Sequence, residues 1–200
     1  MPVEIRQPKQ ERSIETKNKI INSAYKLFSE VGYHSTTTAL IAKNAEVSTG
    51  IVYGYFLDKR AILLDVLELY INKVFQPINA IFDNITLPVD FSQIIEESVK
   101  KTIEIHQENA QMHTTLHSLT GTDEEVNRRF VELEDNLTKQ IAEKLTALGL
   151  KISNVNEKIH LAMNVIQSFA HESVYDMHDY IDYPAMQKIV CQLLVNLFKS

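Results

Sequence analysis

The sequence has few of the features that mark a disulfide-rich or membrane protein. It has one cysteine, Cys191, so neither a disulfide framework nor a cysteine metal site can form within one chain. Cys191 lies in an apolar run, and we expect it to be a small buried hydrophobic residue. The apolar stretches are too short to cross a bilayer, and no charged-then-apolar signal sequence opens the chain. We therefore expect a cytoplasmic protein with no membrane partner.

The sequence also lacks the common motifs of catalysis. It has no Gly-x-Ser-x-Gly elbow, no Walker phosphate loop, no dinucleotide Gly-x-Gly-x-x-Gly and no His-Glu-x-x-His. We predict no catalytic residue, no metal site and no cofactor. The alternative is an all-helical enzyme of an uncharacterised kind.

Glycine is scarce as well, and no segment shows the alternation of a strand. Apolar residues instead recur at the helical period, which predicts an all-α protein. We expect Thr37 or Thr38, Asp58, Asn154 and a Thr122-x-x-Glu125 capping box to begin helices, and Pro77 to end or kink one. The predicted helices cover residues 16–30, 38–45, 49–55, 59–76, 91–108, 110–119, 122–148, 154–180 and 184 onward.

Charge is spread unevenly along the helices. The whole chain has a net charge of −6, but residues 1–60 carry +3 and the remainder −9. Only the N-terminal part should therefore attract phosphate. We predict a flexible basic arm over residues 1–14, a three-helix DNA-binding head over 15–57, and a helical ligand-binding and dimerisation domain over 58–200. One long helix, starting at Lys59, joins the last two.

Two short helices joined by residues 44–48 and braced by a longer one are typical of a helix-turn-helix. The second contains Gly50 and Gly54, one turn apart, and each glycine costs about 1 kcal/mol relative to alanine. A bare face that lets the backbone approach another surface would justify that cost. We expect Ile51, Val52 and Phe56 to point into the core of the head, as does Leu40 in the preceding helix.

The same region resembles the N-terminal signature of the TetR family of regulators. The resemblance covers about residues 16–65 in unbroken order and spacing, and rests on Phe28-Ser29-Glu30-Val31-Gly32-Tyr33, Thr36-Thr37, Ile41-Ala42, Ala45-x-Val47-Ser48, Tyr53-x-Tyr55-Phe56 and Lys59-x-x-Ile62-Leu63. It implies a DNA-binding head, a helical ligand-binding body and a homodimer held by the last two helices.

The resemblance also implies roles for single residues. Phosphate contacts fall on Thr37 or Thr38, Tyr53, Tyr55 and Lys59, and base readout falls on the segment from Ser48 to Gly54, including Thr49 and Gly50. For Tyr53 or Tyr55, packing in the head is the alternative. The family's usual glycine before Val47 is Glu46 here, which implies a backbone that tolerates another residue or is mildly strained. Ala39 replaces a base-reading arginine of some relatives, so readout should depend on hydroxyls, thymine-methyl contacts and close backbone approach.

The predicted arm contains Arg6, Lys9 and Arg12. Two interpretations of this segment remain open. The three cations enter a minor groove, or they belong to a solvated tail.

The resemblance implies an internal ligand pocket in the body, and the sequence offers four candidates for it, His113, His117, Asn164 and Phe169. His113 and His117 have the i, i+4 spacing of a metal pair, but polar lining of an organic-ligand pocket, or surface exposure, explains them better. The predicted dimer face comprises Ile159, Met163, Ile166, Ala170, Ile189, Leu193, Leu194 and Leu197. The alternative for this face is an intramolecular core.

These observations favour a transcriptional repressor that binds a pseudo-palindromic operator as a homodimer and is released by an unknown small-molecule effector. The alternatives are a DNA-binding regulator controlled by a metal ion or a protein partner, and an uncharacterised all-helical enzyme.

Overall fold

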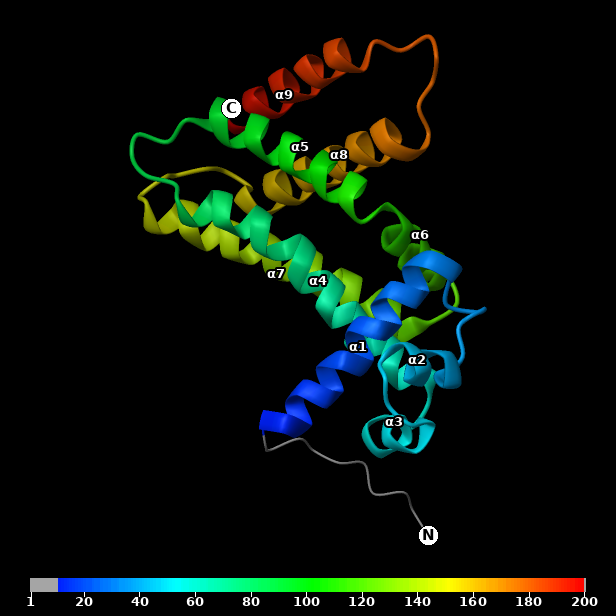
Figure 1. Ribbon diagram of the computed structural model, residues 1–200. Helices are drawn as coiled ribbons and strands as arrows, with labels where there is room; N and C mark the ends of the chain where they lie inside the picture. Colours follow the sequence, from blue (N-terminus) through cyan, green and yellow to red (C-terminus); the bar gives the residue numbers. More distant parts are fainter. Residues whose placement is uncertain (1–10, 200) are drawn as a thin grey trace. The chain divides into compact units, whose positions relative to one another are not determined.

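The computed structural model describes residues 11–199, and within this range it contains nine helices and no strand. Figure 1 shows the path of the chain through these helices. The predicted all-α class is confirmed. The helices are α1 (Glu11–Val31), α2 (Thr38–Asn44), α3 (Thr49–Tyr55), α4 (Lys59–Asp83), α5 (Phe91–Glu108), α6 (Ala110–Thr120), α7 (Glu124–Ala147), α8 (Val155–Tyr175) and α9 (Tyr183–Lys199).

The chain divides into two compact units. The first unit comprises residues 1–72 and 111–127, and the second comprises residues 73–110 and 128–200. Helices α4 and α7 each begin in the first unit and end in the second. The predicted head, residues 15–57, lies within the first unit, but this unit also contains α6, which the prediction assigned to the body.

In the first unit, one face of each helix is buried, as the helical period predicts. The C-terminal half of α1 contributes Ile20, Ala24, Leu27 and Phe28, and the first turns of α4 contribute a second apolar stripe. The other buried apolar side chains of this unit are Ile41, Ala42, Ala45, Val52, Tyr55, Phe56, Ile62, Leu63, Val66, Leu67, Tyr70, Met112, Leu116, Leu119 and Val126.

In the second unit, α5, α8 and α9 lie side by side (Figure 1) and share one apolar cluster. Cys191 is buried in this cluster, as expected, and burial raises the pKa of its thiol. A second cluster joins the later turns of α4 to α7 and α8 through side chains such as Phe82, Ile141 and Ile159. Within residues 11–199, no helix has both the length and the apolar character needed to span a membrane.

Several predicted helix ends are wrong. Helix α1 begins at Glu11, so residues 11–14 of the predicted arm are helical, while Arg6 and Lys9 lie outside the described residues. Helix α4 continues through Pro77 to Asp83. Pro77 lacks only the hydrogen bond that its own nitrogen would donate, and the apolar face beyond it is packed in the second cluster. Helix α8 ends at Tyr175, five residues early.

The capping predictions succeed at α2 and α4 and fail at α7 and α8. Thr37 and Asp58 accept hydrogen bonds from the backbone N–H groups of the first turns that follow them. At α7, however, Asp123 is the cap, and the Thr122 hydroxyl donates instead to the Leu119 carbonyl. Asn154 begins α8 without a side-chain hydrogen bond, because its own backbone is left-handed, with φ of 52°.

The turn between α2 and α3 has the hydrogen bonds of a Schellman motif. The Val47 N–H donates to the Ala42 carbonyl at 3.0 Å, and the Glu46 N–H donates to the Lys43 carbonyl at 3.2 Å. Glu46 occupies the left-handed position of this motif with φ of 57°. Gly149, at the same position after α7, has φ of 82°. The departure from the family's glycine therefore places a side chain where glycine is the favoured residue.

We expect Glu46→Gly to raise the free energy of unfolding by about 0.5–1 kcal/mol, because relief of the left-handed strain exceeds the entropy that glycine gains in the unfolded chain. Urea denaturation measures this change. Glu46→Ala is the control, since it removes the carboxylate but keeps the Cβ atom. An equal gain in both variants would show that the carboxylate, and not the backbone, carries the cost.

Candidate nucleic-acid interface

Helix α3 has one buried and one exposed face. Val52 and Tyr55 are buried, as is Phe56 directly after the helix. Thr49, Gly50, Ile51 and Tyr53 are exposed, and Gly54 is half-buried. Ile51, which was expected in the core, is 43% exposed, and Leu40 of α2 is 37% exposed. These two inward assignments are wrong because α2 and α3 each bury only two of their seven side chains, and Leu40 and Ile51 are not among them. The exposed face thus mixes hydroxyls with an apolar group.

The two glycines of α3 have no structural cause within the protomer. A Cβ atom at Gly54 would meet nothing within 4 Å, and one at Gly50 would meet only Ser48 Oγ at 3.8 Å. Neither glycine has the positive φ that would require it. Alanine would therefore fit at both positions and favour the helix. No contact within the described residues accounts for the cost of these glycines.

The hydroxyls predicted to face DNA lie at the starts of α2 and α3. Thr37 accepts from the Leu40 N–H at 3.2 Å, and Ser48 accepts from the Ile51 N–H at 3.3 Å. The Thr38 and Tyr53 hydroxyls are hydrogen-bonded to each other at 3.1 Å, and this pair is exposed to solvent. It therefore joins α2 to α3 on the exposed side. Of the predicted residues, the structure thus brings Thr38 and Tyr53 into direct contact.

Tyr55 points the other way from Tyr53. Its side chain is buried, and its hydroxyl is hydrogen-bonded to Ser13 Oγ of α1 at 2.9 Å. It thus takes the packing role that the sequence left open for one of the two tyrosines. A phosphate contact by Tyr55 remains an untested prediction.

The Lys59 ammonium is held by the loop between α1 and α2. It donates to the carbonyls of Tyr33 at 2.7 Å, His34 at 3.3 Å and Thr36 at 2.8 Å, and lies 4.3 Å from the centre of the Tyr33 ring. Partial burial lowers its pKa. Because these carbonyls engage its three donors, Lys59 fixes the loop that leads into α2. A contact to phosphate, as predicted, would have to exchange one of these bonds.

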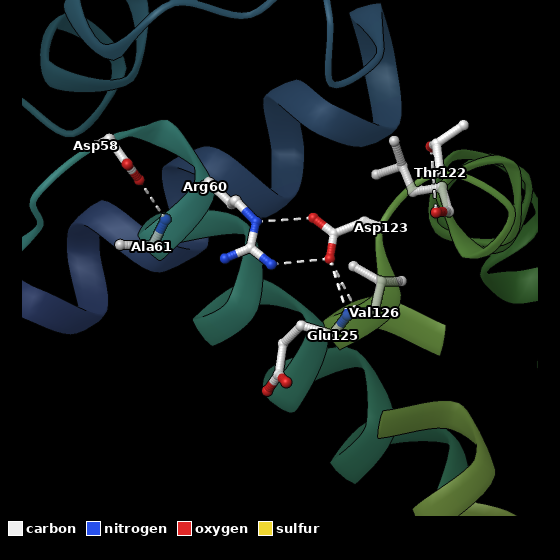
Figure 2. A network of polar contacts seen from close by, with 8 residues as sticks. Asp58, Arg60, Ala61, Thr122, Asp123, Glu125 and Val126 are labelled. Carbon is white, nitrogen blue, oxygen red and sulfur yellow. Dashed lines mark hydrogen bonds and ion pairs between the residues drawn. The ribbon is translucent and has the colours of Figure 1, made fainter. Parts of the chain in front are cut away.

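Arg60 and Asp123 form a bidentate pair between the first turn of α4 and the start of α7 (Figure 2). Arg60 Nε donates to Asp123 Oδ2 at 2.8 Å, and Nη2 donates to Oδ1 at 2.9 Å. The same carboxylate accepts from the Glu125 and Val126 N–H groups and so caps α7. The hydrogen bond from Arg60 is the main cause that lowers the pKa of Asp123. The sequence analysis missed this pair because its partners are 63 residues apart.

The four candidate ligand residues do not come together. His113 is buried in the first unit, where its Nδ1 lies 2.9 Å from the Tyr70 hydroxyl, and its ring lies 4.0 Å from that of His117. In the second unit, Asn164 is exposed and Phe169 is buried in the cluster of α5, α8 and α9. None of the four lines the apolar cavity of the second unit. A ligand role for them remains a prediction.

Metal-ligand spacing occurs once more in the sequence, at Glu157 and His160 of α8, which form a Glu-x-x-His. Among the side chains of residues 11–199, no group of three or more His, Cys, Asp or Glu is arranged to hold a metal ion.

The predicted dimer residues divide into two groups. Ile159, Ile166, Ala170 and Leu194 are buried within the protomer, and Met163 and Leu197 are partly buried. Only Ile189 and Leu193 are exposed, at 68% and 58%. Leu161 on α8 is also exposed, at 51%. For the buried group, packing within the chain accounts for the apolar pattern. This agrees with the alternative interpretation of these residues as an intramolecular core.

Residues 20–66 match the family model described as "Bacterial regulatory proteins, tetR family". Over 76 residues the chain is 43% identical to the HTH-type transcriptional regulator HbdR of Aromatoleum sp. (strain CIB), a match that covers 38% of this chain and 33% of HbdR. Over 109 residues it is 29% identical to the uncharacterized HTH-type transcriptional regulator YhgD of Bacillus subtilis (strain 168), covering 51% and 57%. The chain thus matches about a third of the length of HbdR and somewhat over half of the length of YhgD.

Solved structures share the fold along most of the chain. The fatty acid degradation regulator FadR from Bacillus halodurans has a TM-score of 0.65 at 20% identity, with 94% of this chain and 97% of that chain covered. A transcriptional regulator of the TetR/AcrR family from Thermobifida fusca has a TM-score of 0.61 at 19% identity, with 91% and 97% covered. At these identities the likeness shows the fold alone.

Proposed function

We propose that the chain is a transcriptional regulator of the TetR family that presents α3 to the major groove of an operator. This family consists of regulators, which agrees with the expectation that the chain is not an enzyme. The observation that carries the proposal is the exposed face of α3, where two helix-weakening glycines lie among exposed hydroxyls without any cause inside the protomer.

Sequence readout is proposed to come from a mixed set of contacts. The exposed Ile51 side chain suits the methyl group of thymine, and the Thr49 and Tyr53 hydroxyls suit base edges or phosphates. Gly50 and Gly54 would let the backbone of α3 come close to the groove. None of these contacts requires an arginine, which agrees with the presence of Ala39 where some relatives have a base-reading arginine.

Gly54→Ala tests the proposal. The variant should be about 1 kcal/mol more stable, because alanine favours the helix, and yet bind an operator selected from random DNA at least tenfold more weakly, because the added methyl group blocks close approach. Fluorescence anisotropy measures DNA binding, and urea denaturation measures stability.

The control for this variant is Gly121→Ala, which adds a methyl group at another open position of the first unit. It should leave operator affinity unchanged. If Gly54→Ala binds as tightly as the parent protein, or if the selection yields no preferred sequence, the proposal is wrong.

We propose further that the chain acts as a homodimer through the exposed apolar side chains of α8 and α9. Ile189 and Leu193, one turn apart on α9, and Leu161 on α8 remain exposed in the protomer. A second copy would bury them, and a two-fold dimer matches the symmetry of a pseudo-palindromic operator.

Leu193→Glu should convert the dimer into a folded monomer, because Leu193 is 58% exposed in the protomer but would carry a buried charge in the dimer. Sedimentation velocity at micromolar concentration measures the change. Gln187→Glu adds the same charge on a different face of α9 and should remain dimeric. A monomeric parent protein, or a Leu193→Glu dimer as tight as the parent, contradicts the proposed interface.

We propose that a small-molecule effector bound in the second unit releases the protein from its operator. Helices α4 and α7 both contribute side chains to the apolar cavity there, through residues such as Phe82 and Ile141. Both helices also begin in the first unit, where Arg60 and Asp123 tie their first turns together. A ligand that shifts these helices would thus act on α4, which directly follows the DNA-binding segment, and change the spacing of the two α3 helices in the dimer.

Coupling of this kind is reciprocal, so operator DNA must weaken effector binding by the factor by which the effector weakens DNA binding. A hundredfold effect corresponds to about 2.7 kcal/mol. We expect a ligand found by a thermal-shift screen to bind less tightly when operator is present, as measured by calorimetry. Arg60→Gln should reduce this difference while leaving ligand affinity in the absence of DNA unchanged. Equal affinities with and without operator in the parent protein would exclude control by that ligand.

A further inference from the structure

The apolar cavity of the second unit is small and contains almost no polar groups. Its volume is about 90 Å³, well below the roughly 300–1,000 Å³ of pockets for drug-sized ligands. The space is also smaller than the cavity of about 150 Å³ that binds benzene, so it suits a short alkyl chain better than a ring. The apolar lining comprises Ile78, Phe82, Ile85, Phe91, Ile94, Ile95, Leu137, Ile141, Leu145, Ile159, Ala162, Met163, Ile166 and Phe198.

Three polar side chains complete the lining: Ser98, Thr102 and Gln167. The Thr102 hydroxyl donates to the Ser98 carbonyl at 2.8 Å, so its proton is engaged within α5. Ser98 is 6% exposed, and among the buried side-chain nitrogen and oxygen atoms of residues 11–199, its Oγ stands out as having no hydrogen-bond partner. A buried hydroxyl without a partner is unfavourable and calls for an explanation, of which a ligand is one.

The lining also determines which ligand charge is acceptable. None of the lining residues is Asp, Glu, Lys, Arg or His. A carboxylate or an ammonium in the cavity would therefore be buried without a partner, which is strongly unfavourable. Burial of an uncharged ligand does not carry this free-energy cost.

From these observations, we infer that the cavity binds a small uncharged aliphatic molecule with one alcohol or carbonyl oxygen, and that Ser98 Oγ forms the hydrogen bond that selects this oxygen. The inference rests on the proposed role of the cavity as the effector site and names the chemical class of the effector. The hydroxyl of Ser98 either donates to the ligand oxygen or accepts from it, so an alcohol satisfies it in both directions.

Three probes of matched length test the inference: 1-hexanol, hexane and hexanoate. Methyl NMR of protein labelled at the isoleucine and methionine methyl groups reports binding and locates it, because seven isoleucines and Met163 line the cavity. We expect 1-hexanol to shift these signals and to bind at least tenfold more tightly than hexanoate. Hexanoate binding as tight as that of 1-hexanol, or no binding of 1-hexanol, overturns the proposed class.

Ser98→Ala tests the role of the hydroxyl. It should weaken 1-hexanol binding about tenfold, which is the worth of one buried hydrogen bond, and leave hexane binding within about twofold. The midpoint of urea denaturation should not fall, because the substitution removes an unpaired polar atom. Ser153→Ala, at an exposed position outside the cavity, is the control and should change neither affinity. An equal loss of hexanol and hexane affinity in Ser98→Ala would show that Ser98 acts only by shape.

These titrations contain no DNA, so they are independent of operator binding. Failure of α3 to bind any DNA would overturn the proposed function without affecting them. Failure of 1-hexanol to bind, in a protein that binds its operator, would overturn the ligand class alone.

Discussion

The bidentate pair between Arg60 and Asp123 joins the two helices that both compact units share. One carboxylate does two tasks there, since it receives the guanidinium of α4 and caps the first turn of α7. The start of α7 and the start of α4 are therefore fixed by the same atoms. The pair is partly exposed, so its contribution to stability is small, and its importance lies in geometry.

Lys59 acts in the same region, next to Arg60 in the first turn of α4. By holding three carbonyls of the loop before α2, it makes the position of that loop depend on the first turn of α4. Two adjacent cations thus link this turn to both the segment before the helix-turn-helix and the start of α7. Lys59, which was expected to contact phosphate, thus also fixes the loop that leads into α2.

The sequence predicted the helices well because each buries a regular apolar face, and glycine marked the ends of α1 and α7. It failed where long-range packing decides the outcome. Pro77 did not end α4, since apolar contacts on both sides of it keep the helix intact. Asp123 replaced Thr122 as a cap because Arg60, distant in sequence, also binds it. The assignment of Ile51 and Leu40 to the core was wrong, because a seven-residue helix is too short for its apolar period to define one buried face. The hydroxyls at the starts of α2 and α3 were predictable from local order along the chain. The cavity around Ser98 was not, because residues from five helices distant in sequence line it.

The burial of Cys191 has a practical consequence for studying this molecule. A buried thiol with a raised pKa reacts slowly with maleimides and other thiol reagents. A cysteine introduced on the exposed surface of α1 would therefore take up a fluorophore or spin label selectively in the otherwise unmodified chain. One label per protomer is enough for electron–electron resonance or energy-transfer distances across the proposed dimer, so the separation of its two α1 helices would be measurable in solution without first rebuilding the protein.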